Sequence, residues 1–153
     1  MAVQVIMADL AQLEAVAELF DQYRVFYKQN SDLNLARDFI AERMRLQQSV
    51  IFVALSAEGR ALGFTQLYPS FSSTNAARIW ILNDLFVTPA ARGQGIAPQL
   101  MNAAKQHALA TQAVALELAT ATDNHRAQAL YQSLAYQVDR EFIHYHLPLE
   151  PVQ

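Results

Sequence analysis

A short glycine-containing segment carries the residues best suited to hold a phosphate group. Gly93 and Gly95 are two of only four glycines in the 153-residue chain, and Arg92 precedes them. They stand between an apolar run at 79–87 and a helical pattern at about 95–110. Glycine lets backbone N–H groups turn toward an anion, and the first turn of a helix offers unpaired N–H groups at the positive end of its dipole. The order strand, glycine loop, helix therefore indicates a phosphate or pyrophosphate site.

Spacing separates the phosphate loops that could occur here. The P-loop of ATP- and GTP-binding proteins needs a Lys-Ser/Thr pair after its last glycine, whereas Gly95 is followed by Ile-Ala-Pro. The dinucleotide fingerprint needs three glycines in an early βαβ unit, and this segment has two glycines beyond mid-chain. The segment therefore matches neither motif. On spacing alone, an ordinary helix start that contains two glycines remains an alternative to a phosphate site.

Two blocks of sequence carry a family resemblance. Residues 85–97, Leu-Phe-Val-Thr-Pro-Ala-Ala-Arg-Gly-Gln-Gly-Ile-Ala, resemble the acetyl-CoA signature Arg/Gln-x-x-Gly-x-Gly/Ala of the GNAT superfamily of N-acetyltransferases. Residues 124–136 match the family pattern Asn-x-x-Ala-x-x-Leu-Tyr-x-x-x-Gly-Phe at all but the last pair, which is Ala-Tyr here. The chain is therefore identified as a member of this superfamily, and acetyl-CoA is the implied co-substrate.

The resemblance also assigns roles to individual residues. Tyr131 matches the general acid that protonates the departing CoA thiolate and contacts the cofactor, and Asn124 matches a residue that hydrogen-bonds the pantetheine arm. The remaining cofactor contacts are implied to be backbone groups of Phe86 and Val87, for the pantetheine, and of Arg92, Gly93, Gln94, Gly95, Ile96 and Ala97, for the pyrophosphate. Pro98 has no N–H, so we expect slightly altered phosphate contacts without loss of binding.

Amine acetylation also needs a group that takes a proton from the acceptor. Asp84 lies on the apolar run that leads into the glycine loop and is the first candidate for this base, with Glu117 a weaker one. A structural hydrogen-bonding role for Asp84 stays open.

The acceptor side is expected in the first two helices and a loop at 69–77. Tyr23, Tyr27 and Asp32 are the predicted substrate-binding residues, because aromatic faces near a carboxylate suit an ammonium group. Core packing by the tyrosines and helix capping by Asp32 explain the same pattern equally well.

Composition excludes several classes of function. The chain has no cysteine, which excludes disulfides, thiolate zinc sites and a cysteinyl acyl-enzyme. His144 and His146 lack a third ligand, so we predict no metal. A net charge of −3 argues against a nucleic-acid surface, and no apolar run approaches the ~20 residues of a membrane span. Without a basic leader, a cytoplasmic location is expected.

Periodicity predicts a single α/β (α+β) domain over residues 1–153, in the order β-α-α-β-β-β-α-β-α-β. The predicted strands are 4–7, 50–56, 61–68, 78–87, 113–119 and 137–147, and the predicted helices are 10–23, 32–44, 95–110 and 126–134. Consecutive strands favour antiparallel pairing, while the strand–helix–strand unit at 79–119 requires a parallel crossover. A mixed, mainly antiparallel sheet with helices on both faces results, as in the GNAT fold. The last strand is a candidate edge for a homodimer.

The leading functional hypothesis is transfer of the acetyl group of acetyl-CoA to a primary amine, in a small molecule or a peptide, by direct attack in a ternary complex. The alternative is a non-catalytic module that binds or senses acyl-CoA. Transfer to oxygen, or of a longer acyl group, is more remote, and the acceptor is not named by the sequence.

Overall fold

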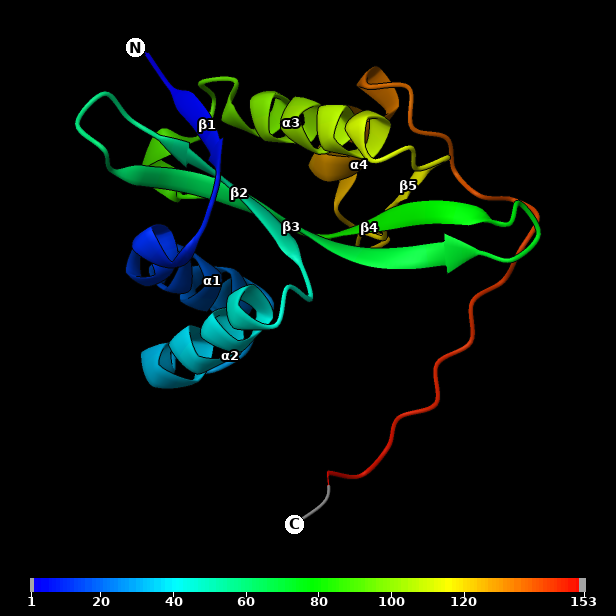
Figure 1. The fold of residues 1–153 in the computed structure, drawn as a ribbon, viewed down its shortest axis with the longest axis horizontal. Helices are drawn as coiled ribbons and strands as arrows, with labels where there is room; N and C mark the ends of the chain where they lie inside the picture. The colour runs from blue at the N-terminus through cyan, green and yellow to red at the C-terminus, as the bar shows by residue number, and fades with distance from the viewer. Residues whose placement is uncertain (1, 152–153) are drawn as a thin grey trace. The chain divides into compact units, whose positions relative to one another are not determined.

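The computed structural model describes residues 2–151, which form two compact units, residues 2–119 and residues 120–151 (Figure 1). The first unit contains a five-stranded sheet in the order β1-β2-β3-β4-β5 and three α-helices. The second unit contains one further helix and an extended C-terminal segment.

The sheet is mixed and mainly antiparallel, as predicted. Its strands are β1 (Gln4–Met7), β2 (Val50–Leu55), β3 (Ala61–Ser72), β4 (Ala77–Val87) and β5 (Leu116–Glu117). Successive strands from β1 to β4 pair antiparallel, whereas β4 and β5 pair in parallel. The helix α3 (Ile96–Ala110) makes the crossover between these two parallel strands.

Helices cover both faces of this sheet. The helices α1 (Leu13–Phe26) and α2 (Leu33–Arg45) lie together on one face, and α3 lies on the other (Figure 1). Two short 3-10 segments, η1 (Leu10–Gln12) and η2 (Pro89–Ala91), precede α1 and α3. The buried cluster between α1, α2 and the sheet consists of Leu13, Val16, Leu19, Phe20, Ala36, Ile40, Ala41, Ile51, Val53, Phe64 and Phe86.

The four α-helices within residues 2–151, which include α4 (His125–Ser133), end in the same type of cap without a glycine. The residue that adopts the left-handed conformation after each helix is Lys28, Gln47, Gln112 or Ala135. At α4, Tyr136 N–H donates to the Tyr131 carbonyl at 3.0 Å and Ala135 N–H to the Gln132 carbonyl at 3.1 Å, which is a complete Schellman motif. The scarce glycines of this chain are therefore used elsewhere.

The predicted loop at 69–77 was wrong, because most of it belongs to strands. β3 continues to Ser72 and β4 starts at Ala77, so only residues 73–76 form the turn. The prediction placed Pro69 in a loop because proline usually interrupts a strand. Here β2 pairs with β3 only as far as Leu67, so Pro69 lies where β3 has β4 as its single neighbour and the missing N–H costs little.

The predicted strands near the C-terminus also need correction. The strand expected at 113–119 is reduced to Leu116–Glu117, and residues 137–151 form no strand at all. Phe142, Tyr145 and Leu147 are 71%, 93% and 80% exposed. Alternating apolar residues make a strand only when a neighbouring strand pairs their N–H and C=O groups, and no described strand does so here.

Candidate active site

The glycine loop has the backbone geometry of an anion site. Gly93 and Gly95 have φ values of +79° and +75°, and Gly95 is the N-cap of α3. A Cβ atom built on either residue meets nothing within 4 Å, so glycine is required for its conformation rather than for space. Residues 92–95 are exposed, and the loop therefore opens to solvent.

The N–H groups of this loop are available to a ligand. Within residues 2–151, none of the N–H groups of residues 93–97 hydrogen-bonds to another residue. They stand at the first turn of α3, where the helix dipole favours negative charge. Pro98, the third residue of α3, supplies no donor. The loop thus fits a pyrophosphate, with fewer donors than a non-proline sequence would offer.

Arg92 is held at the end of β4 beside this loop. Its Nε donates to the carbonyl oxygen of Val87 at 3.0 Å. Its guanidinium lies 5.7 Å from the ring centre of Phe86 and 5.9 Å from that of Phe26. These contacts place a permanent positive charge next to Val87, at the point where the strand leads into the loop.

Asp84 occupies an irregular position in β4. Gln66 of β3 pairs with Asp84 and Leu67 with Leu82, so Asn83 is an extra residue in β4, which makes a β-bulge. The Asp84 side chain is only 1% exposed. Thr65 Oγ1 donates to the Asp84 carbonyl at 2.8 Å and fixes the backbone at this point. Bulges of this kind redirect a side chain, and here a carboxylate is turned into the protein.

The buried carboxylate is compensated by hydrogen bonds. Gln66 Nε2 donates to Asp84 Oδ2 at 2.6 Å, and Asn83 Nδ2 donates to Asp84 Oδ1 at 2.7 Å. The Tyr23 hydroxyl donates to the carbonyl oxygen of the neighbouring Asn83 at 3.3 Å. Burial raises the pKa of Asp84 above its ordinary value, and the nearby polar side chains of Asn83, Gln66 and Tyr23 partly oppose the rise. A carboxylate whose pKa is raised binds a proton more readily than a free carboxylate does, which suits it to act as a base.

Two tyrosines share the electrostatic environment of Asp84. Burial and the nearby Asp84 charge raise the pKa of Tyr23. Burial, followed by the same charge, raises the pKa of Tyr68 to about 12. Both phenols are therefore protonated across the physiological range and act as hydrogen-bond donors or acceptors.

Gln66 links Asp84 to a wider polar network that the sequence analysis missed. Its side chain is fully buried, and Ser49 Oγ donates to Gln66 Oε1 at 2.8 Å. Gln66 Nε2 also lies 3.2 Å from the hydroxyl of Tyr68. A glutamine inside the apolar segment 62–67 was the signal that could have revealed this network, because buried polar side chains require partners.

For the residues predicted to bind the acceptor, the structure shows aromatic packing by two tyrosines and helix capping by an aspartate. Tyr23 lies against Phe64 and Phe86, and the rings of Tyr23 and Tyr27 are 4.9 Å apart. Asp32 is the N-cap of α2, where its carboxylate accepts from the N–H of Leu35 at 3.1 Å. The capping role is therefore present, and a substrate contact by Asp32 stays a prediction.

Asn124 and Tyr131 both belong to α4 in the second unit. Asn124 is the N-cap, and its Oδ1 accepts from the N–H of Ala127 at 3.1 Å. The rings of Tyr131 and Tyr136 lie 6.1 Å apart, across the cap that ends the helix. Ala135 takes the left-handed position at which the family pattern has glycine, with φ of +71°. The departure from the family motif thus preserves the cap geometry.

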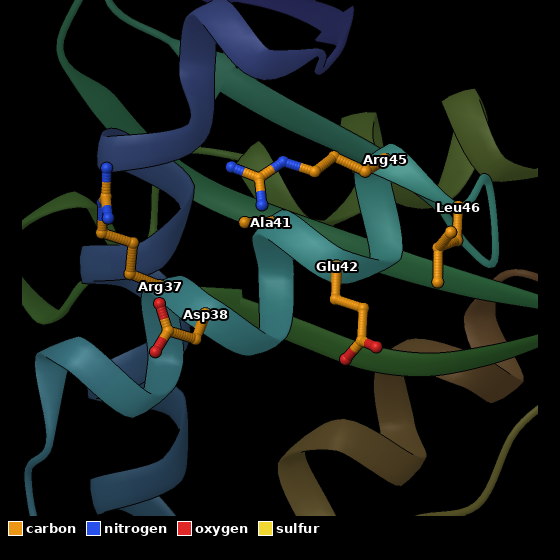
Figure 2. Close-up of a pocket in the computed structure, with 6 residues that line it drawn as sticks. All are labelled: Arg37, Asp38, Ala41, Glu42, Arg45 and Leu46. Carbon is orange, nitrogen blue, oxygen red and sulfur yellow. The ribbon is translucent and has the colours of Figure 1, made fainter.

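A pocket is also found along α2, away from these groups (Figure 2). Its charged side chains balance, with two cations and two anions, so it favours neither kind of ion. The lining residues are Arg37, Asp38, Ala41, Glu42, Arg45 and Leu46. Among residues 2–151 there is no cluster of three potential metal ligands, and no helix is long and apolar enough to cross a membrane.

Comparison with known proteins decides the family. The model of the acetyltransferase (GNAT) family matches residues 13–136. The chain belongs to the GNAT family of acetyltransferases. An uncharacterized N-acetyltransferase, YhfO of Bacillus subtilis, is 46% identical over 90% of this chain and 92% of that protein. The D-amino-acid N-acetyltransferase HPA3 of Saccharomyces cerevisiae is 30% identical over 83% of this chain and 80% of that protein.

Solved structures agree with the GNAT assignment. The crystal structure of a probable acetyltransferase has a TM-score of 0.92 and 44% identity, covering 97% of this chain and 99% of that one. An aminoglycoside N-acetyltransferase in complex with CoA has a TM-score of 0.81 at 18% identity, covering 97% and 96% of the two chains, which shows the shared fold. The GNAT fold, with its mixed sheet, is thereby confirmed.

Proposed function

We propose that this GNAT protein transfers the acetyl group of acetyl-CoA to a primary amine of a small molecule or peptide. The observation that carries the proposal is a single strand, β4, that holds a buried carboxylate and leads directly into an anion-binding loop. A proton acceptor and a pyrophosphate site are the two ends of a reaction centre for acetyl transfer from CoA.

The loop accounts for cofactor binding. The N–H groups of Gly93, Gln94, Gly95, Ile96 and Ala97 would receive the pyrophosphate, and Arg92 would add charge. Backbone groups of Phe86 and Val87 would hold the pantetheine arm and polarise the thioester carbonyl. Acetyl-CoA itself supplies the activated acetyl group, and the protein orients it by main-chain groups that cost no reorganisation.

Asp84 accounts for proton removal. An amine attacks only in its neutral form, so the acceptor ammonium must first lose a proton. The carboxylate of Asp84 is buried, its pKa is raised, and it is held by Gln66 and Asn83. These properties support a base function.

Tyr131 and Asn124 complete the proposal by their match to the family motif. A phenol with a pKa of about 10 can protonate a thiolate with a pKa of about 8.5 at modest cost, which suits Tyr131 for the departing CoA. Asn124 would contact the pantetheine in addition to capping α4. Because the chain has no cysteine, transfer would be direct, without a cysteinyl intermediate.

A screen for release of the CoA thiol tests the proposal. Acetyl-CoA is offered with polyamines, L-amino acids, aminoglycosides, peptide N-termini and, because HPA3 is named for them, D-amino acids. Thiol release that depends on one class of amine supports the proposal. Calorimetric binding of acetyl-CoA with no turnover on any amine favours the non-catalytic acyl-CoA-binding module instead.

The role of Tyr131 is tested by replacing it with phenylalanine. Tyr131→Phe should lower kcat by about 100-fold or more, the range typical of lost general acid catalysis. Tyr136→Phe is the matched control: its hydroxyl is buried without a hydrogen-bond partner among the described residues, and the family pattern has phenylalanine there. Equal kcat values for the two variants would remove Tyr131 from the mechanism.

A further inference from the structure

Gln66 and Asp84 form a directly opposed pair on neighbouring strands. Gln66 of β3 pairs with Asp84 of β4 immediately beside the bulge at Asn83. Alternate residues of a strand share a face, so Gln66 lies on the face of Phe64 and Asp84 on the face of Phe86. Both phenylalanines belong to the buried cluster between the sheet and the helices α1 and α2. The strand pairing therefore brings an amide and a carboxylate together on one side of the sheet.

The side-chain amide of Gln66 uses each of its polar atoms. Its Nε2 donates to Asp84 Oδ2 at 2.6 Å and to the hydroxyl of Tyr68 at 3.2 Å. Its Oε1 accepts from Ser49 Oγ at 2.8 Å. An amide turned the other way would point Oε1 at an ionised carboxylate oxygen, and two acceptors repel each other. The hydrogen bonds therefore define one orientation of Gln66, with its N–H toward Asp84.

Apolar packing does not account for a glutamine at this position. Gln66 is fully buried in the apolar segment 62–67. Burying an amide costs free energy that its hydrogen bonds offset, whereas an apolar side chain of similar size would gain free energy from burial. The backbone of residue 66 can pair with β4 whatever its side chain is. The side chain is therefore explained by its polar partners.

Gln66 holds the Asp84 carboxylate with an uncharged group. A hydrogen bond to an ionised carboxyl favours the ionised form. An arginine or lysine in this place would do the same, but its full charge would lower the basicity of the carboxylate much further. The amides of Gln66 and Asn83 instead fix one carboxylate oxygen each and leave the group able to accept a proton.

The other ionisable groups near this pair keep one charge state over the range in which a carboxyl titrates. Burial raises the pKa of Tyr68 of β3 to about 12, and it also raises the pKa of Tyr23 of α1. Arg43 of α2, which acts on Tyr68, is permanently charged. Among these groups, a change of pH dependence at neutral pH or below therefore reports on Asp84.

We propose that Gln66, anchored by Ser49, is a positioning residue that aims the Asp84 carboxylate and keeps it ionised for proton removal. This proposal rests on the proposed function, in which Asp84 is the base. Gln66 acts through Asp84 and not on the acceptor or on acetyl-CoA. Ser49 acts one step further away, because it holds the amide in the orientation that presents N–H to the carboxylate.

Substitutions at Gln66 test its action on Asp84. Gln66→Met has a similar length but no N–H donor, so the acid limb of the kcat/KM profile should move to higher pH by about one unit or more. Gln66→Glu adds a second carboxyl beside Asp84 and should move the limb further, because two adjacent carboxyls resist ionising together. At neutral pH, kcat should fall by about 10-fold or more in both variants, with the Kd for acetyl-CoA unchanged.

Substitutions at Ser49 test the chain of contacts. Ser49→Ala leaves Gln66 Oε1 without its donor and should move the acid limb in the same direction by a smaller amount. Ser49→Thr keeps a hydroxyl and should retain the wild-type profile. The double variant Ser49→Ala/Gln66→Met should behave like Gln66→Met alone, because Ser49 acts through Gln66.

Thr65→Val is the control for a lost hydrogen bond between the same two strands. Thr65 is also fully buried in β3, but its hydroxyl donates to the backbone carbonyl of Asp84 at 2.8 Å and not to the carboxylate. Thr65→Val should lower Tm and leave the acid limb at its wild-type pH. The ionisation of the acceptor amine is the same for every variant, so differences between variants report on the protein. NMR titration of the aspartate carboxyl carbons, with Asp84 assigned from Asp84→Asn, measures its pKa without turnover.

The outcomes separate the positioning role from the proposed function. An active wild-type protein whose folded Gln66→Met variant keeps its acid limb and its Asp84 titration contradicts the positioning role alone. If Gln66→Met does not fold, unchanged values in Ser49→Ala contradict it instead. Multiplicative effects in the double variant contradict the action of Ser49 through Gln66. A wild-type protein that binds acetyl-CoA yet acetylates no amine contradicts the proposed function, and the positioning role with it.

Discussion

Adding a single methyl group at Gly63 tests how closely β3 and β4 must approach for the site to form. A Cβ atom built on Gly63 lies 2.7 Å from the carbonyl oxygen of Phe86 and 3.2 Å from Cγ2 of Val87. Gly63 pairs with Val87 in the sheet. Non-bonded carbon atoms prefer separations of about 3.5–4.0 Å, so the two strands must move apart by several tenths of an ångström to admit alanine.

The size of the effect follows from this overlap. Forcing one extra carbon into a packed position costs about 1–3 kcal/mol, and each 1 kcal/mol lowers Tm by roughly 2–4 °C in a chain of this length. The atoms that move are the Phe86 and Val87 backbone groups proposed to hold the pantetheine. Loss of one such hydrogen bond, about 0.5–1.5 kcal/mol, should weaken acetyl-CoA binding by roughly 2-fold to 10-fold.

Calorimetry and thermal unfolding of Gly63→Ala measure both effects. Gly59→Ala is the matched control, because Gly59 has φ of +81° but nothing within 4 Å of its built Cβ. It should lose about 1–2 kcal/mol through backbone strain and keep its affinity for acetyl-CoA. Wild-type stability and affinity in Gly63→Ala, or an equal loss of affinity in both variants, would refute the reasoning.

Two further predictions concern stability. Burial raises the pKa of Asp84 in the folded state, so between its ordinary and raised pKa values the folded protein binds the extra proton and the free energy of unfolding falls as pH rises. Asp84→Asn should therefore gain stability relative to wild type as the pH rises above about 4. Urea titrations at successive pH values check this prediction, and a difference that shrinks with rising pH would contradict it. The left-handed conformation of Ala135 costs an L-residue about 1–2 kcal/mol. Glycine avoids this cost but loses more chain entropy on folding, so Ala135→Gly should raise the free energy of unfolding by roughly 0.5–1 kcal/mol. Thermal unfolding measures it, with Ala103→Gly in the interior of α3 as a control that should lose stability.

The local patterns of the sequence predicted the helices and most of the sheet. Apolar periodicity placed α1 and α2, and the run at 78–87 placed β4. The strand predicted at 137–147 was wrong, because its alternating residues say nothing about whether a neighbouring strand is available to pair with them. The loop predicted at 69–77 was wrong for a related reason, since the cost of Pro69 depends on which side of β3 is paired.

What the sequence determined by itself is the local geometry of the glycine loop, which is the proposed cofactor site. Gly93, Gly95 and Arg92 act through local backbone geometry and local charge, which residue types and spacing specify directly. Only the tertiary structure determined the burial and the hydrogen-bond partners of Asp84. Its partner Gln66 lies 18 residues away in the chain, and both the bulge at Asn83 and the register between β3 and β4 bring them together. Burial and the choice of hydrogen-bond partner are properties of that strand pairing, so only the fold could decide them.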